Sequence, residues 1–88
     1  MTKRNLQWDA DAWDEYLEWQ TKDKTIVKRI NQLTKDMLRH PFEGIGKPEG
    51  LKGNLSGFWS RRINDEHRIV YAVEDDVIII FERKNHYD

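Results

Sequence analysis

Hydrophobic positions in the first half of the chain recur at the spacing of an α-helix, in which residues three and four apart share a face. Asp9 and Asp23 each precede such a stretch, and an aspartate there caps a helix because its carboxylate accepts a backbone N–H of the first turn. We therefore expect two helices joined as a hairpin. The first should span about residues 10–21, with Trp13, Tyr16, Leu17 and Gln20 on one face; the second should run to about residue 39, with Ile26, Ile30, Leu33 and Met37 on one face.

The second half of the chain has the pattern of β-strands, with short apolar and β-branched runs separated by turn residues. Proline disfavours the α conformation of the residue before it, so His40 and Pro41 should end the second helix. Residues 41–53 hold two prolines and four glycines and are predicted to be a loop. Strands are expected at residues 58–63, 67–73 and 77–84, and a short extended segment at Asn5–Trp8.

The order of these elements, β-α-α-β-β-β, predicts an α+β fold. Connections of three residues suit antiparallel hairpins, so we expect an antiparallel sheet with the helical hairpin packed on one of its faces. Residues 1–88 should form a single domain, because one hydrophobic core serves chains of about 50 to 200 residues. Charged residues make up 35% of the chain, above the usual ~25%, which favours a small core and modest stability.

The composition excludes several classes of protein. The chain has no cysteine, which rules out disulfides and thiolate metal sites, and its histidines lack partners at metal-ligand spacing. No stretch approaches the ~18 apolar residues that cross a bilayer. The formal net charge of -1 argues against a purely electrostatic nucleic-acid binder. We therefore expect no metal, no cofactor and no membrane association, and a protein suited to a reducing cytoplasm.

Basic residues are nevertheless concentrated between residues 47 and 68. A local positive potential can steer an anionic ligand even when the whole protein is close to neutral. This segment therefore favours an anionic ligand. Its basic residues are Lys47, Lys52, Arg61, Arg62 and Arg68, and its acidic residues are Glu49, Asp65 and Glu66.

Several chemically active side chains fall on one expected face of the sheet. Side chains two residues apart share a face of a strand, so the meander could bring together Glu49, Arg62, Arg68 and His86. Carboxylate and imidazole groups move protons, and the planar arginine fork matches phosphate oxygens, so this set is competent to cleave a phosphodiester. Each group also has an ordinary interpretation: a solvated carboxylate, arginines paired with carboxylates, and a histidine near the chain end. The residues alone indicate a small α+β domain, with RNA binding as one interpretation.

Sequence motifs throughout the chain carry a family resemblance. They are W-D-x-Y-L-x-W at residues 13–19, H-P-F-E-G at residues 40–44, the block at residues 47–73 with its K-P-E and E-H-R segments, and H-Y at residues 86–87. With these motifs the chain closely resembles the YoeB toxins, the Txe/YoeB branch of the RelE/ParE superfamily of bacterial toxin–antitoxin systems. The likeness covers about residues 6–87.

The resemblance implies an endoribonuclease, an mRNA interferase of the bacterial cytoplasm. It would enter the A site of a translating 70S ribosome and cleave mRNA there, inhibiting translation. The reaction implied is attack of a ribose 2′-hydroxyl on the adjacent phosphate, by acid–base catalysis without a metal. The resemblance also implies a cognate antitoxin of the YefM/Phd type, whose disordered acidic segment folds over the toxin, and homodimers.

The resemblance assigns roles to the residues that match the family's motifs. Glu49 would be the general base, Arg68 the stabiliser of the transition state and His86 the general acid. Tyr87 would help to orient the substrate or the acid. Residues expected to contact the RNA phosphates are Lys52 and Arg62, together with Lys47 of the basic segment.

Two departures from the family pattern fall next to these residues. Gly50 follows Glu49 where a proline is expected, and Asp88 extends past Tyr87. Glycine in place of proline predicts a more mobile chain beside the general base. The acidic end near His86 would favour its imidazolium form.

Two alternative functions keep the same fold. A toxin of this fold could block the A site without cutting, or inhibit DNA gyrase as the ParE-type relatives do, since a fold alone does not settle function. A ribosome-independent ribonuclease is disfavoured, because the predicted set has one carboxylate and one histidine rather than two histidines. The chemistry of any cleaved RNA distinguishes these functions.

Overall fold

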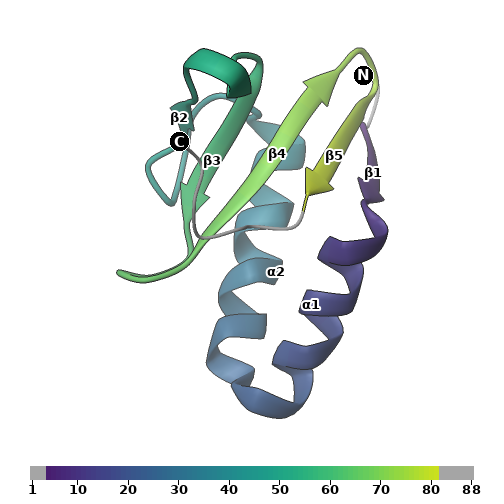
Figure 1. Ribbon diagram of the computed structural model, residues 1–88, viewed down its shortest axis with the longest axis vertical. Helices are drawn as coiled ribbons and strands as arrows, with labels where there is room; N and C mark the ends of the chain where they lie inside the picture. The colour runs from purple at the N-terminus through teal and green to yellow at the C-terminus, as the bar shows by residue number, and fades with distance from the viewer. Residues whose placement is uncertain (1–3, 82–88) are drawn as a thin grey trace.

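The computed structural model describes residues 4–81, so that His86, Tyr87 and Asp88 lie outside the described residues. The chain folds into a helical hairpin against a five-stranded sheet, which confirms the expected α+β class (Figure 1). Its elements are β1 (Asn5–Trp8), α1 (Ala10–Lys22), α2 (Lys24–Arg39), β2 (Glu49–Gly50), a 3-10 turn (Gly53–Leu55), β3 (Phe58–Arg62), β4 (Arg68–Glu74) and β5 (Val77–Phe81).

The strand order is β1-β5-β4-β3-β2, and the meander from β2 to β5 is antiparallel as expected. The sheet departs from the expected antiparallel arrangement at β1, which runs parallel to β5 with Asn5 opposite Val77. A parallel neighbour needs a long connection, and here the whole helical hairpin and three strands separate β1 from β5 along the chain. The first strand thereby occupies the sheet edge beside β5 instead of extending the meander.

Helix α2 follows the expected pattern closely. Asp23 caps it by accepting a hydrogen bond from the Thr25 N–H at 3.0 Å, and His40 ends it just before Pro41. The helix buries its predicted stripe against the sheet, because those side chains recur on one face. The core of the described residues is this stripe, Ile26, Ile30, Leu33 and Met37, packed with Ala12, Ile69, Tyr71, Ile78 and Ile80.

The face of α1 that meets the core differs from the expectation. Trp13 and Leu17, two members of the predicted face, are 43% and 45% exposed, whereas Ala12 is buried. Tyr16 and Trp19 pack beside the core and complete a face shifted by one residue from the predicted one. Apolar residues occupy both faces of α1, so the periodicity alone could not decide between them.

The two faces of the sheet are chemically different. Ile69 and Tyr71 of β4 point toward the helices, so Arg68 and Val70, which alternate with them, point to the opposite face. Figure 1 shows α2 passing behind β4, and the helical hairpin extending below the sheet. The helix-free face is therefore where the candidate polar residues can meet. Among residues 4–81 neither helix is long and apolar enough to span a membrane.

Candidate active site

A short strand that the sequence pattern did not predict positions Glu49. Within the expected loop, β2 pairs antiparallel with β3, placing Glu49 opposite Ser60 and Gly50 opposite Trp59. The N–H of Leu51 donates to the Phe58 carbonyl at 2.9 Å and continues the pairing. Since directly opposed residues project to the same face, the Glu49 carboxylate lies on the same side of the sheet as Ser60.

Arg68 reaches this carboxylate from β4. Its Nη1 lies 3.4 Å from Ser60 Oγ in β3 and 3.4 Å from Glu49 Oε1 in β2, on the far side of β3. The side chains of Arg68 and Glu49 are 40% and 65% exposed. An ion pair this exposed contributes at most about 1 kcal/mol, so a ligand can readily compete for either group.

These side chains line an open groove on the helix-free face, with a volume of about 390 Å³. That volume falls within the range of about 300–1,000 Å³ typical of small-molecule sites. The groove combines a carboxylate, two cations and a hydroxyl with apolar walls, so it can take up a phosphate together with an attached ring. Its lining residues are Glu49, Gly50, Leu51, Lys52, Ser60, Arg68 and Val70.

A second arginine stands next to the groove. Arg62 of β3 is exposed and lies directly opposite Arg68 in the register of the sheet. Like charges at directly opposed positions destabilise a sheet. A bound anion would relieve this repulsion, and the planar guanidinium groups suit phosphate oxygens.

The structure brings together most of the predicted site residues that it describes. Glu49, Lys52 and Arg68 share the groove, with Arg62 beside Arg68. Lys47 is exposed, with a positive φ of 51°, and is not among the residues that line the groove. The predicted roles of His86 and Tyr87 fall outside the described residues and stay predictions.

Sequence reasoning did not single out Ser60 or the role of Arg61. Strand alternation placed Ser60 on the face of Arg62, but a serine in a strand carries no signal that distinguishes a groove residue from a surface one. Arg61 belonged to the predicted basic segment, yet its side chain is fully buried on the helix side of the sheet. An arginine within a basic segment does not reveal from the sequence that it pairs with a carboxylate elsewhere in the chain.

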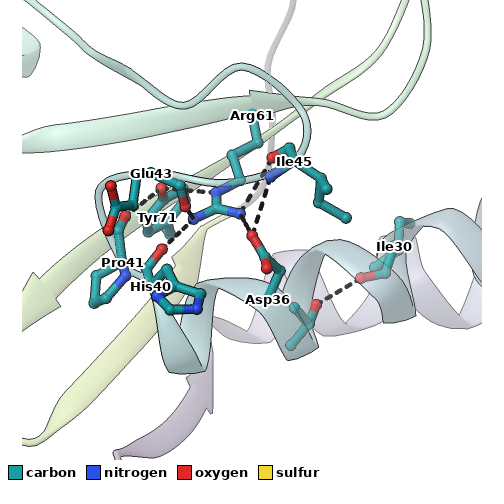
Figure 2. Close-up of polar contacts among 9 residues, drawn as sticks. Ile30, Asp36, His40, Pro41, Glu43, Ile45, Arg61 and Tyr71 are labelled. Carbon is teal, nitrogen blue, oxygen red and sulfur yellow. Dashed lines mark hydrogen bonds and ion pairs between the residues drawn. The ribbon is translucent and has the colours of Figure 1, made fainter.

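The guanidinium of Arg61 binds five acceptors, as Figure 2 shows. Nη1 donates to Asp36 Oδ2 at 2.7 Å, and Nε donates to the Tyr71 hydroxyl at 3.0 Å. An arginine has five N–H donors, so the hydrogen-bonding capacity of this buried group is used fully. The other three acceptors are main-chain carbonyls of the loop after α2, those of His40, Glu43 and Ile45.

The two partners of Arg61 have shifted acidities. Burial would raise the pKa of Asp36, but hydrogen bonds from Arg61 and the Ile45 N–H, with the charges of Arg61 and His40, hold it below its ordinary value of 3.8. Burial raises the pKa of the Tyr71 hydroxyl, and Arg61 only partly opposes this shift. At neutral pH Asp36 is therefore ionised and Tyr71 is protonated, donating at 2.7 Å to the Pro41 carbonyl.

The site offers acid–base groups rather than metal ligands. Within residues 4–81, no three His, Cys, Asp or Glu residues cluster so that they could hold a metal ion. What the groove provides is a carboxylate able to accept a proton, with guanidinium and ammonium groups able to bind an anion. This combination suits chemistry on a phosphate ester.

Comparison with known proteins gives one consistent set of relatives. The profile of a family described as YoeB-like toxin of bacterial type II toxin–antitoxin system matches residues 8–87. Toxin YoeB of Escherichia coli (strain K12) is 62% identical over 82 residues, which is 93% of this chain and 98% of that protein.

Two solved structures from Staphylococcus aureus share the fold throughout. A YoeB dimer is 48% identical, with a TM-score of 0.87 over 98% of this chain and 100% of its own. A heterotetrameric YoeB–YefM toxin–antitoxin complex contains a chain that is also 48% identical, with a TM-score of 0.85 over the same shares.

Proposed function

The chain belongs to the YoeB-like toxins of bacterial type II toxin–antitoxin systems, and we propose that it is an endoribonuclease that cleaves mRNA in the ribosomal A site. The observation that carries this proposal is the groove in which the Glu49 carboxylate and the Arg68 guanidinium lie 3.4 Å apart, with Lys52 on its wall. A proton acceptor beside phosphate-binding cations is what cleavage of RNA at a phosphodiester needs.

In the proposed reaction the ribose 2′-hydroxyl attacks the adjacent phosphorus. Its proton passes to the Glu49 carboxylate as the O2′–P bond forms, and the P–O5′ bond breaks as His86 protonates the leaving oxygen. The products are a 2′,3′-cyclic phosphate and a 5′-hydroxyl, so the step balances with no further reactant. Arg68 stabilises the negative charge that develops on the phosphoryl oxygens, with its planar fork matched to two of them.

Other residues around the groove bind and orient the RNA in this proposal. Arg62 and Lys52 contact the phosphates that flank the cleaved bond, and Lys47, which lies outside the groove, contacts the backbone further along. Tyr87 orients the substrate or the His86 imidazole. This proposal has few catalytic and RNA-binding residues, and they line an open groove that cannot fix the conformation of the mRNA alone. The ribosome would fix that conformation, which explains the dependence on the ribosome.

The partners proposed for this toxin follow from its relatives. We propose a YefM/Phd-type antitoxin whose acidic segment covers the Arg62–Arg68 face and displaces the C-terminal end, and a homodimer like that of the Staphylococcus aureus relative. The place of action is the bacterial cytoplasm, where ribosomes translate. Exposed Trp13 and Leu17 on α1 offer an apolar surface for the second copy.

Primer extension on a defined mRNA tests the function directly. The purified protein is incubated with the mRNA alone and with programmed 70S ribosomes, and the ends of any fragments are analysed. A cut at the A-site codon that needs ribosomes and leaves a cyclic phosphate supports the proposal. Intact mRNA on ribosomes that hold the toxin would instead assign A-site blockade, and inhibition of gyrase supercoiling with no ribosomal effect would assign the other alternative.

A further inference from the structure

The buried guanidinium of Arg61 binds the loop that leads to Glu49, and this points to a role in the active site. We propose that Arg61 is a positioning residue, which sets the register of β2 and thereby places the Glu49 carboxylate against Arg68. The role in catalysis rests on the proposed function of Glu49 as general base. The effect on the position of β2 does not depend on that function.

Strand β2 has little to fix its own register. It is two residues long, and within residues 4–81 it is the last strand of the sheet order, with β3 as its one pairing partner there. A slip of one residue would turn Glu49 to the opposite face of the sheet, since side chains alternate along a strand. The correct register therefore has to be imposed by the chain on either side of β2.

The chain before β2 is held closely by β3. Arg61 binds the carbonyls of residues 40, 43 and 45, and the Arg62 N–H donates to the Gly46 carbonyl at 2.7 Å. Only two residues, Lys47 and Pro48, then separate Gly46 from Glu49. Consecutive residues of β3 thus hold the loop and pair with Glu49, so the loop and the strand move together.

The loop also packs closely against the core, which restricts its conformation. Gly46 has a φ of +82°, and a Cβ at this position would lie 2.6 Å from the Leu33 side chain. The carboxylate of Asp36 accepts hydrogen bonds from Arg61 and from the Ile45 N–H, linking α2 to the same loop. The bonds of Arg61 are therefore the centre of a network that fixes residues 40–46 (Figure 2).

Core stability alone does not explain an arginine at this position. Replacing a buried ion pair with apolar side chains of similar volume is often neutral or stabilising, because both charges must be desolvated. Three of the five acceptors of Arg61 are carbonyls of the loop rather than groups of the core. The arginine is suited to ordering a loop, since its fixed fork can bind several carbonyls at once.

The first test compares Arg61→Lys with a matched buried control. Lysine keeps the charge but has three donors in place of five. Thr34→Val is the control, because Thr34 is buried and its hydroxyl donates within α2, to the Ile30 carbonyl at 2.7 Å. Single-turnover cleavage on programmed ribosomes should fall about 10- to 100-fold for Arg61→Lys at saturating enzyme, as expected for a misplaced catalytic group. The enzyme concentration that gives half the maximal rate should stay near the wild-type value in Arg61→Lys. For Thr34→Val the cleavage rate itself should stay near the wild-type value.

A double-mutant cycle separates positioning from general structural damage. If Arg61 acts through Glu49, then Arg61→Lys should cost little further rate in a Glu49→Gln background. An undiminished loss in that background would overturn the proposal. Asp36→Asn supplies a second variant should Arg61→Lys fail to fold, since it weakens the same network from α2 and should show the same coupling.

A measurement that needs no activity keeps this inference separate from the proposed function. The Leu51 N–H, bonded to the Phe58 carbonyl, reports whether β2 is paired with β3. Its hydrogen exchange should accelerate at least tenfold in Arg61→Lys or Asp36→Asn and stay unchanged in Thr34→Val. Unchanged protection of Leu51 in both network variants would overturn the positioning role. Inactive wild-type protein with the expected exchange would count against the proposed function only.

Discussion

Glu49 and Arg68 lie on strands that are not neighbours in the sheet, yet their side chains meet across β3 at 3.4 Å. Ser60, in the strand between them, lies opposite Glu49 and accepts a hydrogen bond from Arg68 at 3.4 Å. The exposed pair contributes little to the free energy of unfolding. Its significance is instead that a phosphate bound by Arg68 would lie next to the carboxylate proposed as the base.

The opposed arginines predict a gain in stability at the cost of RNA binding. Arg62→Gln removes the repulsion between Arg62 and Arg68, so the free energy of unfolding should rise by about 0.2–1 kcal/mol. Binding to programmed ribosomes should weaken, and its dependence on salt should become shallower by roughly one released counterion. Denaturant unfolding and binding titrations at several salt concentrations check both effects. Tighter binding by Arg62→Gln would contradict a phosphate-binding role.

Ser60 should orient Arg68 rather than take part in proton transfer. Ser60 is 2% exposed, and Ser60→Ala removes a hydroxyl that accepts from Arg68 at the long distance of 3.4 Å. A net hydrogen-bond contribution of about 0.5–1.5 kcal/mol corresponds to a roughly 2- to 10-fold fall in cleavage rate. Single-turnover cleavage measures it. A loss as large as that of Glu49→Gln would assign Ser60 a catalytic role instead.

Gly50 should tolerate the proline expected from the family pattern. The bond from the Leu51 N–H to Phe58 means that the Gly50 N–H points away from β3, because donors alternate along an antiparallel strand. A Cβ at Gly50 would lie at an ordinary 3.7 Å from the Trp59 ring. Gly50→Pro should therefore stabilise the fold by about 0.4–1 kcal/mol by reducing the entropy of the unfolded chain. Thermal unfolding checks this, and a destabilised variant would mean that β2 needs the glycine.

The pKa of Asp36 predicts how stability depends on acid. Its folded-state pKa lies below the ordinary 3.8, so its contribution is fully present above about that pH. The contribution is lost as the pH falls through the folded-state value, where the native carboxylate takes up a proton. Asp36→Asn should therefore lower the free energy of unfolding at neutral pH. It should also make the decrease in this free energy shallower as the pH falls from about 4 to the folded-state pKa. Asp75→Asn, in the exposed turn after β4, is the control and should follow the wild type.

The sequence predicted the helices and the three long strands because their periodic patterns depend on local residues alone. It could not predict β2, because a strand of two residues in a segment rich in glycine and proline carries no periodicity. This strand is ordered instead by its pairing with β3 and by the contacts of Arg61 with the preceding loop. The parallel pairing of β1 escaped prediction for a similar reason, because a strand's partner far along the chain leaves no local pattern. Periodicity could not decide which side of α1 meets the core, because both of its faces carry large apolar residues.

The candidate site was predictable in part. Strand alternation placed Arg62 and Arg68 on one face, and the family resemblance selected Glu49 among the acidic residues. Alternation also put Arg61 on the face opposite Arg62, but nothing in the sequence indicated that Arg61 is fully buried and Arg62 exposed. Their difference comes from the alternation of β3 between core and groove, together with the carboxylate of Asp36.

The most direct test of the central claim is the rate of A-site cleavage by Glu49→Gln in single turnover on programmed ribosomes. The substitution keeps the shape of the side chain and removes the proton acceptor, which general-base catalysis predicts will slow cleavage by about 10²- to 10⁴-fold. Because the Glu49 side chain is 65% exposed, folding should be unaffected, and ribosome binding should be close to that of the wild type. Cleavage by Glu49→Gln at the wild-type rate would contradict the assignment of this groove as the active site.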